Sequence, residues 1–200
     1  VDELGGIVDG DHIIAICALD LRERGLLRAD TVVVTVMTNL GFRLAMERSG
    51  IRVVETAVGD RYVLEAIAAE GASLGGEQSG HVVFADHATT GDGMLTALAL
   101  LDVVQRSGRR LSDLASAAMT QLPQVLVNVA VSGSASDVLD APAVATEIAA
   151  ATDRLGSEGR VLVRPSGTEP LVRVMVEAPT AEEARSHADA LAAVIAAASA

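Results

Sequence analysis

The stretch TVVVTVM at residues 31–37 decides how the first half of the chain folds. It is β-branched and almost wholly apolar, which is typical of a strand buried on both faces of a parallel sheet. Segments with helical periodicity flank it at residues 9–24 and 40–49, and Gly25 and Gly50 follow them as stop signals. This order of helix, strand and helix predicts an α/β domain.

The same alternation of strands and helices continues to about residue 119. The expected elements are a strand, a helix begun by Asp60, a short strand, a further strand and two helices, at residues 51–55, 60–70, 72–75, 81–84, 91–106 and 111–119. Short links between such elements are typical of a parallel α/β sheet. We therefore assign residues 9–122 to one α/β domain and residues 1–8 to the remnant of a preceding domain.

The pattern changes near Pro123. Beyond it the expected order is strand, helix, strand, strand and helix, at residues 125–131, 143–151, 160–163, 172–177 and 181–197. Two adjacent strands between two helices predict a small α+β domain with a partly antiparallel sheet. We assign this second domain to residues 123–200.

Composition limits the kinds of ligand that the chain can bind. The formal net charge is −12, with 27 acidic and 15 basic residues, and such a surface repels nucleic acid and anionic membranes. A phosphorylated ligand therefore needs a local basic pocket. Cys17 is the only cysteine, no stretch is long and apolar enough to span a bilayer, and no signal peptide is recognisable. We expect a cytoplasmic protein that binds neither nucleic acid nor membrane.

A glycine-rich loop, GGEQSGH at residues 75–81, carries the first candidate site. Between its glycines lie a carboxylate, an amide, a hydroxyl and an imidazole, from Glu77, Gln78, Ser79 and His81. This set can donate and accept hydrogen bonds in many directions, as a polyhydroxylated ligand requires. The loop follows a predicted parallel strand, whose carboxyl edge usually holds the ligand. A surface turn with a helix-capping serine explains the residues equally well.

A second loop, RPSGTEP at residues 164–170, joins two predicted strands and supplies the local basic pocket. It combines a guanidinium fork, two hydroxyls and a glycine that lets backbone N–H groups turn toward one point, and an arginine follows on the adjoining strand. The candidate phosphate-binding residues are Arg164, Ser166, Gly167, Thr168 and Arg173. We favour phosphate binding over a tight hairpin with an exposed arginine.

Other polar residues give weaker signals. Asp60 is interpreted as the N-cap of its helix, and Arg61 is a candidate ligand group because a cation is poorly placed in a first helical turn. A turn and a helix cap explain GDG at residues 91–93, and helix capping explains Asp9 and Asp11 better than a metal loop does. The remaining histidines have no cluster of partners and are interpreted as surface or structural residues: His12, His87 and His187.

Together and in order, these motifs resemble the α-D-phosphohexomutase superfamily. The resemblance covers essentially the whole chain and rests on GEQSGH, GDG, RPSGTEP, TVMTNLGF and VGDRYVLE, at residues 76–81, 91–93, 164–170, 35–42 and 58–65. The last two segments, with Gln78, look more like the phosphoglucosamine mutases of that superfamily than its phosphomannomutases or phosphoglucomutases. A phosphomannomutase or phosphoglucomutase fragment and a stand-alone phosphosugar-binding module stay open as alternatives.

The resemblance implies an isomerase of four domains that interconverts glucosamine 6-phosphate and glucosamine 1-phosphate through a phosphoserine and a bisphosphate intermediate. Glu77 and Ser79 would contact sugar hydroxyls, and His81 would lie near the reacting centre as a candidate acid or base. The second loop would hold the phosphate that is not being transferred, with Arg173 and Arg61 as further candidates.

The resemblance also implies what this chain lacks. Neither the phosphoserine loop nor the DGDGDR-type loop that holds Mg²⁺ in the complete enzymes occurs in the sequence. We therefore expect domains three and four of such an enzyme, with no metal bound and no turnover by the chain alone. The implied partners are a hexosamine phosphate and the missing N-terminal domains, and a homodimer of the full enzyme stays open.

Overall fold

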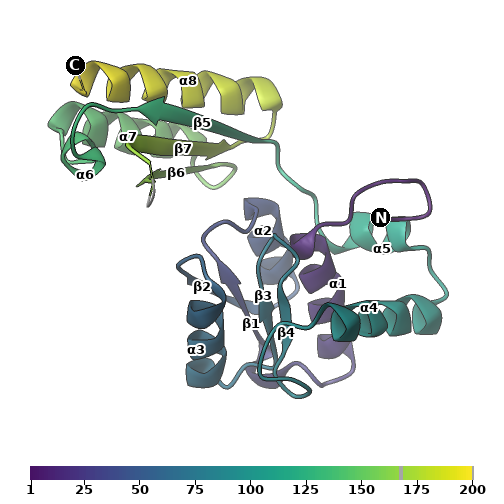
Figure 1. The fold of residues 1–200 in the computed structure, drawn as a ribbon. Helices are drawn as coiled ribbons and strands as arrows, with labels where there is room; N and C mark the ends of the chain where they lie inside the picture. The colour runs from purple at the N-terminus through teal and green to yellow at the C-terminus, as the bar shows by residue number, and fades with distance from the viewer. Residues whose placement is uncertain (167–168, 200) are drawn as a thin grey trace. The chain divides into compact units, whose positions relative to one another are not determined.

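The computed structural model describes residues 1–166 and 169–199, and its two units are Val1–Gln121 and Leu122–Ala200 (Figure 1). The sheet of the first unit has the order β2-β1-β3-β4. Its strands are β1 (Thr31–Thr35), β2 (Arg52–Thr56), β3 (Leu74–Gly76) and β4 (Val82–Phe84). β1 is parallel to both β2 and β3, whereas β4 is antiparallel to β3. The predicted parallel sheet is confirmed, with one antiparallel strand at its edge.

Helices cover both faces of this sheet. They are α1 (Gly10–Glu23), α2 (Leu40–Arg48), α3 (Asp60–Glu70), α4 (Gly93–Ser107) and α5 (Leu111–Ala118), with a short 3₁₀ turn η1 (Arg28–Asp30) before β1. Val32 and Val34 of β1 pack toward α1, while Val33 packs with Val63 and Ile67 of the α3 side. This two-sided burial explains why the central strand is a continuous β-branched run.

The chain turns away from β1 earlier than the sequence predicts. The strand ends at Thr35 rather than at residue 37, because the chain must turn to begin α2. Asn39 is the N-cap of that helix, and its side-chain oxygen accepts a hydrogen bond from the Gly41 N–H at 2.9 Å. Side-chain capping of this kind satisfies one of the free N–H groups of the first turn.

Two capping predictions have different outcomes. Asp9 is the N-cap of α1, and its side chain accepts from the His12 N–H. The prediction that Asp60 caps α3 is wrong. Gly59 is the N-cap, with φ of +134°, and Asp60 is the first helical residue.

The second unit is an antiparallel sheet with helices on one face. Its elements are β5 (Gln124–Ala130), α6 (Ala135–Leu139), α7 (Pro142–Leu155), β6 (Arg160–Pro165), β7 (Leu171–Glu177) and α8 (Ala181–Ala198), and the strand order is β5-β7-β6. Val172, Val174 and Val176 of β7 share a core with α7 and α8. The predicted α+β character is confirmed, while α6, only five residues long, is too short to show a helical period.

No helix in the described part of the chain combines the length and apolar character that crossing a bilayer requires.

Candidate functional site

The first candidate site lies where parallel strands of the first unit end. The residues after β3, here called the sugar loop (residues 77–81), form a tight turn in which Gly80 N donates to the Glu77 carbonyl at 2.9 Å and Glu77 N donates to the His81 carbonyl at 3.0 Å. Glu77 also reaches the loop after β2, because its Oε1 accepts from Gly59 N at 3.0 Å. The sugar loop and the beginning of α3 are therefore tied together.

Only one of the three loop glycines serves the turn. Gly80 has φ of +96° and open space where a Cβ would stand. Gly75 and Gly76 are buried in β3 and take no part in the exposed turn, although the sequence reads as one glycine-rich loop. A Cβ on Gly75 would lie 2.7 Å from the Val33 carbonyl, and one on Gly76 would lie 2.5 Å from the His81 carbonyl. These two glycines allow close packing of strands instead.

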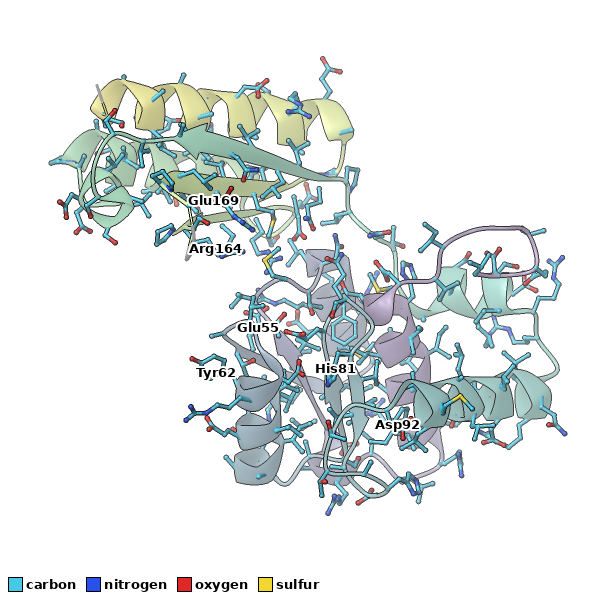
Figure 2. The ribbon with its side chains drawn as sticks, viewed as in Figure 1. Glu55, Tyr62, His81, Asp92, Arg164 and Glu169 are labelled. Carbon is cyan, nitrogen blue, oxygen red and sulfur yellow. The ribbon has the colours of Figure 1, made fainter. Side chains whose placement is uncertain are left out.

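His81 is held between two groups that sequence reasoning did not connect with it. Its Nε2 lies 3.1 Å from Asp60 Oδ2, which explains where the Asp60 carboxylate points when it does not cap α3. On the other side, a Cβ on Gly91 would stand 2.3 Å from Nε2. Figure 2 shows His81 and Asp92 close to the beginning of α4. Asp92 caps that helix, accepting from Met94 N at 2.8 Å. In the GDG motif, Asp92 therefore caps α4, and the absence of a side chain at Gly91 leaves space for the imidazole.

Two other candidates differ in their surroundings. Ser79 Oγ lies 3.5 Å from Glu77 Oε2, so these two predicted sugar ligands are brought together. Arg61 instead donates from Nε to Glu65 Oε1 at 2.7 Å, and its side chain is 81% exposed. A surface ion pair one helical turn apart accounts for this arginine without a ligand.

The second candidate site is the hairpin between β6 and β7. Arg164 and Arg173 are directly paired across these strands, and Asn128 of β5 is the next partner along the row. Arg173 Nη2 lies 3.6 Å from Glu169 Oε2, and Figure 2 shows Glu169 and Arg164 at the same end of the sheet. Like charges placed opposite each other on one sheet face repel.

Polar atoms near this hairpin have unused hydrogen-bonding capacity. Ser166 Oγ and Arg173 Nε are buried and have no hydrogen-bond partner within the described residues. Ser166 N donates to the Leu171 carbonyl at 2.9 Å, which closes the hairpin. Gly167 and Thr168, both predicted to hold phosphate, lie outside the described residues.

A hollow of about 540 Å³ lies elsewhere in the first unit, between α1, α4 and α5. Ile16, Val103 and Arg106 line it, and no residue of the sugar loop does. Of the three arginines that line it, Arg106 is already bound to Asp20 through two hydrogen bonds of 2.9 Å. We therefore give this hollow no part in the chemistry of the predicted site.

Comparison with known proteins identifies both units. The family model "Phosphoglucomutase/phosphomannomutase, alpha/beta/alpha domain III" matches residues 9–122, and that of the C-terminal domain matches residues 126–194. The phosphoglucosamine mutase of Frankia alni is 63% identical over 99% of this chain, and that of Streptomyces coelicolor is 62% identical over 96%. The chain spans only 43% and 42% of the lengths of these relatives.

Solved structures show the same fold. The Aspergillus fumigatus N-acetylphosphoglucosamine mutase, solved in complex with GlcNAc-6P and magnesium, matches with a TM-score of 0.79 at 22% identity. The match covers 100% of this chain and 46% of that one. A Burkholderia thailandensis phosphoglucomutase/phosphomannomutase family protein matches with a TM-score of 0.77 over 97% of this chain and 43% of that one, also at 22% identity.

Proposed function

The chain belongs to the phosphoglucomutase/phosphomannomutase family, and from this premise we propose that it is the sugar-reading and phosphate-holding part of a phosphoglucosamine mutase. Such an enzyme interconverts glucosamine 6-phosphate and glucosamine 1-phosphate. The relatives at 63% and 62% identity bear that name. The observation that carries the proposal is the pairing of Arg164 with Arg173 beside the β6–β7 hairpin.

The proposed phosphate-binding site follows from the charges of Arg164 and Arg173. On a chain with a net charge of −12, two guanidinium groups directly opposite each other need a negative partner. Arg173 meets only Glu169, at 3.6 Å, and Arg164 has no ion pair within the described residues. A phosphate accepts bidentate hydrogen bonds from guanidinium groups, and Ser166 Oγ offers a further donor. These groups would hold the phosphate that is not being transferred.

The proposed sugar contacts use two side chains of the sugar loop. Glu77 Oε1 is occupied by Gly59 N, whereas Oε2 accepts only a long hydrogen bond of 3.5 Å from the Ser79 hydroxyl, so sugar hydroxyls would bind to this oxygen and this hydroxyl. His81 belongs to the same loop, its Nε2 lies 3.1 Å from Asp60 Oδ2 without satisfactory hydrogen-bond geometry, and it is our candidate for moving a proton at the reacting oxygen. A general acid or base needs a suitable position before its acidity matters.

This division of labour suits a reaction in which the sugar turns round between two half-reactions. The proposed reaction runs through a phosphoserine and a bisphosphate intermediate, and either orientation presents hydroxyls to one loop and a phosphate to the other. Binding energy from the remote phosphate then aligns the reacting oxygen. Because the chain spans 43% of its Frankia relative, we propose that it binds the sugar phosphate but does not turn it over alone.

Magnesium belongs to the proposal only for the complete enzyme. The Aspergillus structure was solved with magnesium. Among the residues that this structure describes, no group of three or more His, Cys, Asp or Glu side chains could hold a metal ion. No role proposed for the residues of this chain depends on the ion.

Calorimetry on the 200-residue chain tests the proposal. Glucosamine 6-phosphate should bind, and Arg164→Ala should weaken binding at least tenfold, since a hydrogen bond to a charged group contributes about 1.5–3 kcal/mol. Arg154→Ala is the matched control, because Arg154 pairs with Glu147 on α7, within the same unit. Equal affinities of Arg164→Ala and the wild type would contradict the proposal. Tighter binding of mannose 6-phosphate or glucose 6-phosphate would favour a phosphomannomutase or phosphoglucomutase.

A further inference from the structure

The carboxylate of Asp9 lies where three parts of the first unit meet, namely the beginning of α1, the sugar loop and the end of the unit. Its Oδ1 accepts from the backbone N of His12 at 3.1 Å and lies 2.7 Å from His12 Nδ1. Its Oδ2 accepts from Gln121 Nε2 at 3.4 Å, at the end of the unit. The side chain of Gln78, in the sugar loop, lies close enough to this carboxyl group to lower its pKa.

Backbone packing at Gly10 joins the beginning of α1 to the sugar loop independently of that side chain, and α2 holds the end of the unit. Gly10 N donates to the Gln78 carbonyl at 3.0 Å, and a Cβ on Gly10 would stand 2.1 Å from the Glu77 carbonyl. Where the chain leaves the unit, a Cβ on Gly41 would stand 1.9 Å from the Thr120 carbonyl. Neither the sugar loop nor the exit segment (residues 119–121) has room to shift without moving its neighbours.

A residue that only capped α1 would not need a carboxylate. A serine or threonine hydroxyl is a sufficient acceptor for the first-turn N–H group. The Asp9 carboxylate instead uses both oxygens, which together offer about four lone-pair sites. One oxygen faces His12 and the other faces Gln121.

We propose that Asp9 is a positioning residue that couples the sugar loop to the exit segment. Leu122, the next residue after the exit segment, begins the second unit. A displacement of the connection to that unit would therefore reach the sugar loop through the Asp9 side chain and the adjacent Gly10–Gln78 backbone hydrogen bond. The role of the loop rests on the proposed function, whereas the coupling rests only on the contacts of Asp9.

Hydrogen exchange measured on the 200-residue chain tests the coupling without any ligand. Asp9→Ala should speed exchange of the sugar-loop amides of Glu77 and Gly80, and of the amides of the exit segment, by at least tenfold. Thr180→Ala is the matched control, because Thr180 caps α8 through a bond to Glu183 N in the other unit. It should leave both segments unchanged. If Asp9→Ala speeds exchange only in the first turn of α1, Asp9 is merely a cap and the proposal is overturned.

Asp9→Asn and ligand binding complete the test. The amide keeps one acceptor for the His12 N–H and offers an NH₂ group, with which the Gln78 and Gln121 amides can pair by rotating. Exchange of both segments should return to within about threefold of wild type, and failure of this rescue would contradict the coupling. With glucosamine 6-phosphate, Asp9→Ala should bind at least fivefold more weakly than Asp9→Asn, and equal affinities would contradict the positioning role. If the wild type does not bind, the proposed function fails, while the exchange result still decides the coupling.

Discussion

Arg164 of β6 and Arg173 of β7 are direct partners across an antiparallel strand pair, with Asn128 of β5 on the far side of Arg173. At paired positions on one sheet face, charges of opposite sign attract and like charges repel, by up to about 1 kcal/mol. A pair of arginines at this position is therefore a poor choice for stability alone. We propose that the pair serves to bind a phosphate.

Removing one arginine of this pair should therefore have opposite effects with and without phosphate. Without phosphate, Arg164→Gln should leave the melting temperature unchanged or raise it, because the repulsion is relieved. Excess inorganic phosphate should raise the melting temperature of the wild type more than that of the variant, since a ligand stabilises the state that binds it. Differential scanning fluorimetry with and without phosphate measures both effects. This account would be refuted if the variant melted at a lower temperature than the wild type without phosphate, and if phosphate raised both melting temperatures equally.

Cys17 should be chemically silent in the folded chain. Burial raises the pKa of its thiol to about 12, and the nearby Asp20 carboxylate adds to the effect. Since the thiolate is the nucleophile, iodoacetamide at pH 8 should leave the native protein unmodified and should label it readily in urea. Mass spectrometry of the intact chain reads the outcome. Fast labelling under native conditions would show that the first core opens far more often than its packing implies.

The sequence predicts elements well where burial itself sets the residue type. The run Val32–Val34 had to be a central strand because both of its faces are covered, and the alternating valines of β7 had to face one core. The loops after β3 and β6 were expected from the polar, glycine-containing stretches between predicted strands. Local chemistry was sufficient for these features.

What the sequence did not predict depends on contacts between distant residues. Asp60 has the residue type of an N-cap, but Glu77, 17 positions along the chain, supplies the bond to Gly59 N, and the Asp60 carboxylate faces His81 instead. Gly91 looked like a turn residue, and its contact with the His81 ring became visible only in three dimensions. Such pairings have no local periodicity and no adjacent partner that would reveal them.

The ion pair of His12 predicts a pH dependence of stability. A hydrogen bond to Asp9 raises the pKa of His12 above 6.5, against the opposing effect of burial, and the charges of Asp9 and Asp11 add to the increase. A raised folded-state pKa stabilises the fold fully below the unfolded value, and that contribution is lost as the pH rises through the folded value. His12→Gln should remove this part of the profile.

Urea titrations between pH 5.5 and 9 measure this effect as the difference in unfolding free energy between wild type and His12→Gln. The difference should shrink steadily as the pH rises above about 6.5. The pH range in which the pair stabilises the fold ends on the acid side where Asp9 is protonated. Hydrogen bonds from His12 outweigh the burial of Asp9 and lower its pKa below 3.8. A difference that does not change with pH would show that His12 contributes only through its shape.

Gly91 and Gly93, two positions apart in one motif, allow a paired test of what holds the His81 imidazole in position. A Cβ on Gly91 would stand 2.3 Å from His81 Nε2, whereas one on Gly93 meets nothing within 4 Å. Gly91→Ala should therefore destabilise the first unit by about 1–3 kcal/mol through overpacking and shift the His81 ring resonances. Gly93→Ala, at the first residue of α4, should stabilise it by about 0.5–1 kcal/mol, because alanine is the better helix former. Chemical denaturation and ¹H–¹⁵N spectra of the imidazole record both results. Similar stabilities and unchanged His81 resonances in the two variants would mean that Gly91 does not shape the position of the imidazole.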